Sequence, residues 1–248
     1  MKTICNSFVN RIKNTTKLGL GASTIFQLGH NCYIETALKF PDAQILIGSG
    51  KPNEPNARII KYATTHKELF KLMENNKGLL LELVLSELVQ HWFDYLLEIY
   101  KEVIKKSIRG EKCYNLPKLQ PKIDVTKISS TNLEQVLIDA SVESFDFETS
   151  QNKLHIIRKA LNVDLSNVSN DVESIKKFIT IRNIFQHNLG VVRTDDVVGL
   201  GFANISLDTG KSIRQFKVGD RLELSPFDIE AYADSIIAVS QALVSSNS

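Results

Sequence analysis

Apolar residues recur every three or four positions along much of the chain, the spacing that gives an α-helix one buried face. The longest such pattern predicts a helix over residues 79–108. Shorter patterns predict helices over 131–146, 151–161 and 171–188, and a last one from Pro226 onward. The apolar stripe of the longest helix comprises Leu81, Leu85, Leu88, Trp92, Leu96, Ile99 and Val103. Together these patterns predict a mainly α-helical fold.

Residues that favour helix ends support these boundaries. Thr65 and Glu68 have the spacing of a capping box, in which each side chain bonds to the backbone of the other residue at the start of a helix. Asn170 is the expected N-cap of the helix over 171–188, and Gly190 is the glycine expected just beyond its end. Ser225 is the expected cap of the last helix.

Between the last two predicted helices the pattern becomes strand-like. Residues 190–207 and 212–225 have strand character, and Asp208-Thr209-Gly210 between them has the composition of a hairpin turn. The chain is therefore expected to form a helical bundle with a small β-hairpin insertion before its C-terminal helix. This helical domain is predicted to span residues 65–248.

The N-terminal part, residues 1–64, shows no equally clear helical pattern. Residues 32–56 are interpreted as short strands or irregular structure ending in a turn rich in Gly, Pro and Asn. The segment is basic: residues 1–67 carry a net charge of +6, whereas the remaining residues carry −4. This asymmetry fits either a polyanionic partner or a solvated, lysine-rich surface.

Composition excludes several classes of protein. The three cysteines are far apart and form no CxxC pair, so neither a zinc ribbon nor a disulfide framework is expected, and the cytoplasm is the simplest compartment. The most apolar stretch is interrupted by Glu82, Glu87 and Asp94, which argues against a membrane span. No phosphate-binding loop, dinucleotide fingerprint or metal-ligand spacing stands out, so no cofactor and no metal are expected.

One triplet remains as candidate chemistry: Arg182, Asn183 and His187 in "RNIFQHN". In a helix, Asn183 and His187 are four residues apart and share a face, and the long side chain of Arg182 can reach the same groove. Arginine holds a phosphate with two hydrogen bonds, and histidine exchanges protons near neutral pH. The same residues also fit an ordinary helix end, where a histidine interacts favourably with the helix dipole.

The triplet and its setting resemble the HEPN superfamily (higher eukaryotes and prokaryotes nucleotide-binding domain). The signature of that family is an Arg, often followed by Asn, with a His after four to six intervening residues, as in Arg182, Asn183 and His187 here. The resemblance covers about residues 65–248 and includes the "HNLG" that ends the motif. It implies a helical fold that dimerises with its motif helices facing each other.

The resemblance also implies an activity. Many HEPN proteins are metal-independent endoribonucleases, acting as toxins of toxin–antitoxin pairs or in antiviral (anti-phage) defence. We therefore expect RNA cleavage by 2′-hydroxyl attack, with His187 in proton transfer, Arg182 on the scissile phosphate and Asn183 orienting the phosphate or the imidazole. Glu82 and Glu87 are candidate acids facing the same groove.

The expected partners are RNA, a second copy of the chain in a homodimer, and an antitoxin or other regulatory protein. Two alternatives stay open at this point. One is a catalytically inactive HEPN-like dimer that binds RNA, a nucleotide or a protein through the same groove. The other is a module that works with a nucleotidyltransferase partner. RNA specificity, the trigger of activity and the role of residues 1–64 cannot be derived from the sequence.

Overall fold

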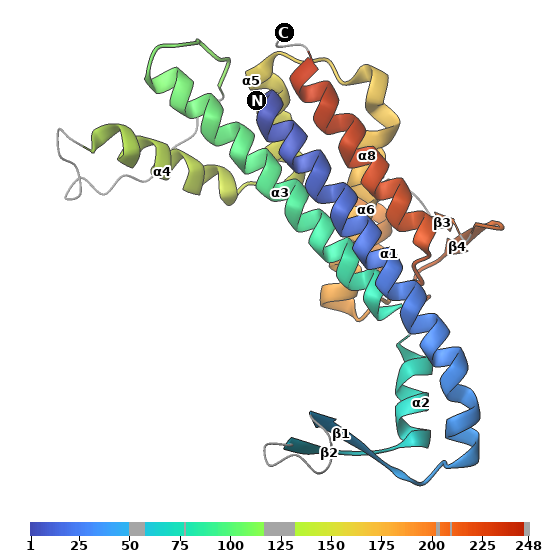
Figure 1. Cartoon of the computed structure of the whole chain (residues 1–248). Helices are drawn as coiled ribbons and strands as arrows, with labels where there is room; N and C mark the ends of the chain where they lie inside the picture. Colours follow the sequence, from blue (N-terminus) through green and yellow to red (C-terminus); the bar gives the residue numbers. More distant parts are fainter. Residues whose placement is uncertain (50–57, 77, 117–131, 202–203, 209, 246–248) are drawn as a thin grey trace. The chain divides into compact units, whose positions relative to one another are not determined.

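The computed structural model shows a mainly helical protein with a β-hairpin before its last helix, which confirms the predicted fold class (Figure 1). The chain forms two compact units: Met1–Lys17 together with Glu82–Ser248, and Leu18–Leu81. The predicted boundary between residues 64 and 65 does not coincide with this division. The structure describes residues 1–49, 58–76, 78–116, 132–201, 204–208 and 210–245.

Three helices that are distant in the sequence lie side by side in the first unit (Figure 1). They are the first part of α1 (Lys2–Lys39), together with α3 (Leu79–Ile108) and α8 (Pro226–Ser245). The rings of Phe8 on α1 and Tyr95 on α3 stack with their centroids 4.4 Å apart. The Tyr95 hydroxyl donates to the Ser240 carbonyl oxygen on α8 at 3.0 Å. Tyr95 therefore contacts both neighbouring helices, and burial raises its pKa.

Helix α1 corrects the interpretation of the N-terminal segment. The chain is helical from residue 2 to residue 39, so the expectation of strands or irregular structure is wrong for residues 32–39. Strand structure follows only in β1 (Gln44–Ser49). The buried face of the first part of α1 comprises Cys5, Phe8, Val9 and Ile12, whose spacing is helical. This face is what holds the start of α1 against α3 and α8.

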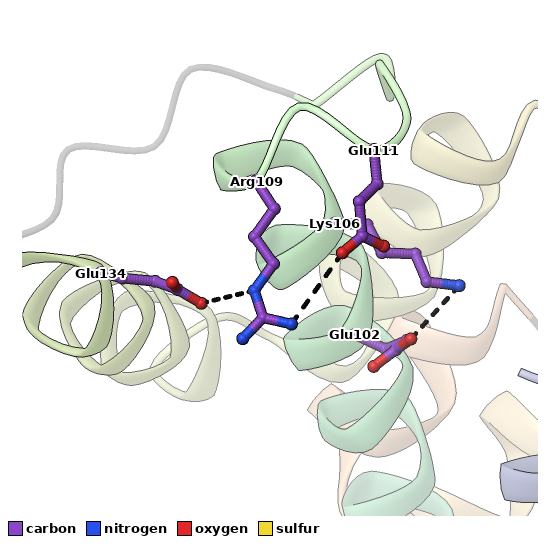
Figure 2. Close-up of polar contacts among 5 residues, drawn as sticks. All are labelled: Glu102, Lys106, Arg109, Glu111 and Glu134. Atoms are coloured by element: carbon purple, nitrogen blue, oxygen red, sulfur yellow. Dashed lines mark hydrogen bonds and ion pairs between the residues drawn. The ribbon is translucent and has the colours of Figure 1, made fainter.

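Helix α3 has the predicted bounds, and α4 (Leu133–Asp146) packs on its second half. Tyr100 of α3 and Phe145 of α4 stack with centroids 4.1 Å apart. A cluster of charged side chains joins the same two helices where α3 ends: Figure 2 shows Arg109 bonded through Nε to Glu134 at 2.7 Å. These side chains are about half exposed, so the pair contributes at most about 1 kcal/mol, and the stacked rings carry most of the packing.

Helix α5 (Ser150–Leu161) confirms the predicted helix over 151–161, and α6 (Ser169–Asn188) confirms the one over 171–188. The expected cap of α6 is wrong, because Asn170 lies inside the helix. A short 3-10 helix, η2 (Ser166–Val168), leads directly into α6, so the residues just before α6 are already helical. Leu189 and Gly190 follow α6 with positive φ angles of 52° and 81°, and this left-handed conformation ends the helix where Gly190 was predicted to end it.

The segment between α6 and α8 differs in part from its prediction. Residues expected as a strand form a helix instead, α7 (Thr194–Leu200). Asp196 explains the difference, since its Oδ2 accepts the backbone N–H of Arg193 at 2.8 Å and so caps the start of a helix. The predicted hairpin is confirmed by the antiparallel pair β3 (Ile205–Asp208) and β4 (Ile213–Phe216). Thr209 of the predicted turn lies outside the described residues.

Ser225 caps α8 as predicted: its hydroxyl accepts the backbone N–H of Asp228 at 3.2 Å. The Asp228 carboxylate also ties the hairpin to α8, because it accepts the backbone N–H groups of Asp208 and Ser225, each at 2.9 Å. Burial raises the pKa of Asp228, and those hydrogen bonds oppose the shift. None of the described helices combines the length and hydropathy that crossing a membrane requires.

The second unit contains the remainder of α1, the antiparallel strands β1 and β2 (Arg58–Thr65), and α2 (His66–Asn75). The capping box at the start of α2 is confirmed: the Thr65 hydroxyl accepts the Glu68 N–H at 3.2 Å, and the Glu68 carboxylate accepts the Thr65 N–H at 2.9 Å. In the same unit, His30 of α1 stacks on Phe70 of α2 with centroids 5.0 Å apart. Most of the turn predicted to precede β2 lies outside the described residues.

Candidate functional site

The last two turns of α6 carry the Arg-Asn-His triplet. Two fully buried residues, Ile181 and Ile184, fix the rotation of this part of the helix, because both point into the core. The same rotation leaves Arg182 half-buried and places Asn183 and His187 on the exposed face. Asn183 and His187 are one helical turn apart, as their spacing predicted.

Arg182 and Asn183 contact each other directly. The Arg182 guanidinium donates through Nη1 to Oδ1 of Asn183 at 3.1 Å. This hydrogen bond uses one edge of the guanidinium and holds it beside the exposed face of α6. Burial lowers the pKa of Arg182, yet an arginine remains charged at any physiological pH. The pair therefore presents a fixed positive charge at the surface of the helix.

Tyr232 of α8 lies behind Arg182 and was not among the residues singled out from the sequence. Its ring packs on Phe178, with centroids 5.2 Å apart, and Phe178 precedes Arg182 by one helical turn on α6. Arg182 and Tyr232 interact electrostatically, and burial raises the pKa of the tyrosine. Neither the Arg182 Nε nor the Tyr232 hydroxyl has a hydrogen-bond partner among the described residues. Two polar groups of the site thus face a buried interior rather than solvent.

His187 occupies the last turn of α6. Its side chain is exposed and, in the described part of the chain, makes no hydrogen bond or ion pair. No carboxylate of a described residue therefore orients the imidazole within one copy of the chain. Both ring nitrogens are accessible to a substrate or to a second protein molecule.

The residues beside His187 hold the end of α6 in place. Gln186 donates through Nε2 to the Ser86 hydroxyl of α3 at 3.2 Å. Asn188 donates through Nδ2 to Oδ2 of Asp196 on α7 at 3.3 Å. His187 is thus flanked on both sides by residues that connect α6 to neighbouring helices, while its own side chain remains unrestrained.

The two candidate acids on α3 make no hydrogen bond or ion pair with the triplet among the described residues. Glu87 lies 3.5 Å from His91 on its own helix, and the His91 ring in turn bonds to the Thr15 hydroxyl of α1 at 3.1 Å. Glu82 is half-buried; burial raises its pKa, and the positive charge of Arg221 partly offsets the increase. Neither carboxylate bonds to a member of the triplet among the described contacts, so the structure gives no support for their assignment to it.

Within the described residues, no group of three or more His, Cys, Asp or Glu side chains is arranged to hold a metal ion. The groups that the site does offer are a guanidinium, an amide and an exposed imidazole, a set suited to binding a phosphate and moving a proton. A scan against protein-family models finds no match to this chain. Searches of curated proteins and of solved structures find no match either.

Proposed function

We propose that the chain is a metal-independent endoribonuclease of the HEPN type. The observation that carries the proposal is the arrangement at the end of α6, where the Arg182 guanidinium bonds to Asn183 and an exposed His187 lies one turn further on. A fixed guanidinium next to an unrestrained imidazole suits a phosphodiester, which needs charge stabilisation and proton transfer at neighbouring atoms.

In the proposed reaction, the 2′-hydroxyl oxygen of the RNA attacks the adjacent phosphorus. A bond forms between that oxygen and phosphorus, and the bond from phosphorus to the 5′-oxygen of the next nucleotide breaks. A base removes the proton of the 2′-hydroxyl, and an acid supplies a proton to the leaving 5′-oxygen. Arg182 stabilises the charge that develops on the phosphate oxygens, and Asn183 orients either the phosphate or the imidazole of His187.

The reaction needs both a base and an acid, whereas each copy of the chain supplies one histidine at the site. A two-fold homodimer with the exposed faces of α6 turned toward each other would bring two copies of His187 to one groove. One imidazole would then act as the base and the other as the acid. This activity suits a cytoplasmic toxin or anti-phage effector. RNA would be its substrate, and an antitoxin or regulatory protein would inhibit it.

Cleavage of total RNA by the purified full-length protein in EDTA tests the proposal. We expect cleavage by the native chain and a decrease of at least about a hundredfold in His187→Ala, because the proton-transfer step loses its catalyst. Lys101→Ala removes an exposed charge from α3 and should cleave like the native protein. Circular dichroism of each variant establishes that the helices are intact.

Two results would contradict the proposal. If folded His187→Ala cleaves like the native chain, the assigned mechanism is wrong. If the native chain binds RNA without cleaving it, the protein is the inactive, RNA-binding form of the same dimer. Association with a nucleotidyltransferase in a pull-down would favour the remaining alternative from the sequence.

A further inference from the structure

A cavity of about 480 Å³ lies between α5, η2 and the first half of α6, away from the Arg182–His187 end of that helix. Its floor is apolar: Trp92 of α3, Leu165 before η2 and Ile175 of α6 all line it, and each is buried. The volume lies in the range of sites that enclose one small molecule. An aromatic residue in such a floor suits a flat, apolar ligand body.

The rim of the cavity is polar and includes His155, Arg158 and Lys176 as nitrogen-bearing side chains. A second hollow of about 670 Å³ shares His155 and Arg158 and adds Lys159. Arg158 therefore lies where the two hollows meet. It is exposed and makes no hydrogen bond or ion pair with a described residue, so its guanidinium is free to bind a ligand.

The acidic groups at the rim are already engaged. The two carboxylate oxygens of Asp164 accept the backbone N–H of Ser166 at 3.0 Å and the Ser166 hydroxyl at 2.7 Å. These hydrogen bonds lower the pKa of Asp164 and keep it ionised, and the charge of Arg158 lowers it slightly further. Glu173 lies 3.9 Å from Lys176 on α6. Of Arg158 and Lys176, only Arg158 is thus left without a hydrogen bond or ion pair to a described residue.

We propose that this cavity binds a small organic anion with a planar ring. The ring lies on the apolar floor beside Trp92, and the phosphate or carboxylate group accepts hydrogen bonds from Arg158, a residue suited to holding either anion with two parallel bonds. Lys176 of α6 also lines the cavity, where it is paired with Glu173. All of these residues belong to one copy of the chain, so the site is independent of the proposed nuclease and of dimer formation.

Trp92 is the only tryptophan of the chain and provides the readout. We titrate the full-length protein with adenosine monophosphate, guanosine monophosphate and naphthoate, and follow the tryptophan fluorescence. At least one probe should change the emission saturably at micromolar to millimolar concentration. A response to the nucleotides alone identifies a phosphate ligand, and a response to naphthoate alone identifies a carboxylate; both support the site.

Two variants locate the binding. Arg158→Gln should weaken it at least about tenfold, because the charged hydrogen bonds to the anion are lost. Val172→Phe fills the cavity from α6 and should abolish it, whereas Lys101→Gln, an exposed change on α3, should leave it unchanged. The proposal is overturned if no probe gives a saturable change up to millimolar concentration. It is equally overturned if a saturable change has the same affinity in folded Arg158→Gln.

Discussion

The two candidate sites lie on the same helix, α6, but differ in what a single copy of the chain supplies. The cavity beside the first half of α6 has an apolar floor, a polar rim and a free Arg158, all from one chain. The triplet at the other end has a fixed Arg182 but an exposed His187 that makes no hydrogen bond or ion pair with a described residue. Under the two proposals, the cavity should work in a monomer, whereas the triplet would need a second copy to supply a second proton-transfer group.

Among variants that should affect one site and not the other, Arg182→Lys is expected to have the largest effect. Lysine keeps the charge but loses the planar group that bonds to Asn183 and can also hold a phosphate oxygen. We expect RNA cleavage to fall about a hundredfold, since a positioned donor to the transition state is lost. The fluorescence response of Trp92 to its anionic ligand should not change.

Single-turnover cleavage rates and the Trp92 titration, measured on the same preparation, check this prediction. Cleavage at the native rate in Arg182→Lys would show that a point charge is sufficient and that the hydrogen bond to Asn183 plays no part in catalysis. A parallel loss of the fluorescence response would show that the two ends of α6 are not independent.

A smaller effect is expected from the residue behind the triplet. Tyr232→Phe removes a buried hydroxyl that has no described hydrogen-bond partner, and such a group costs free energy in the folded state. The free energy of unfolding should therefore rise by up to about 1 kcal/mol, while the ring still packs on Phe178. Urea denaturation of the two proteins measures the difference. A loss of stability of more than about 1 kcal/mol would instead mean that the hydroxyl is hydrogen-bonded in the folded protein.

The helices with continuous apolar stripes and clear caps could be predicted from the sequence. Helix α3 has the predicted bounds, and the capping box of Thr65 and Glu68 forms as expected, because both depend on interactions between residues close in the chain. The triplet could be found for the same reason, because the last two turns of α6 contain all of it.

The predictions failed where weak local signals competed. The stripe of Cys5, Phe8, Val9 and Ile12 was a usable helix signal for the start of α1, but glycines and β-branched residues further along the helix obscured it. In α7, the two adjacent valines suggested a strand, whereas the acidic first turn and Gly201 after the last residue were the signals for a helix.

Contacts between segments that are distant in the chain could not be predicted from the sequence. Tyr232 reaches Arg182 only because α8 packs along α6, and no local pattern records that pairing. The cavity of Trp92, Arg158 and Lys176 likewise joins three helices whose spacing in the chain gives no indication that they meet. The positions of Glu82 and Glu87 on α3 depend on the same kind of long-range packing.

The most direct test of the central claim is the specific activity of RNA cleavage across a dilution series, measured together with the dimer fraction by sedimentation. If the triplet of one copy needs the triplet of another, cleavage per chain should fall in proportion to the dimer fraction as the protein dissociates. The Trp92 response to its ligand should stay constant per chain over the same series. Constant specific activity in a fully dissociated monomer would contradict the account, because a single exposed His187 would then be sufficient for catalysis.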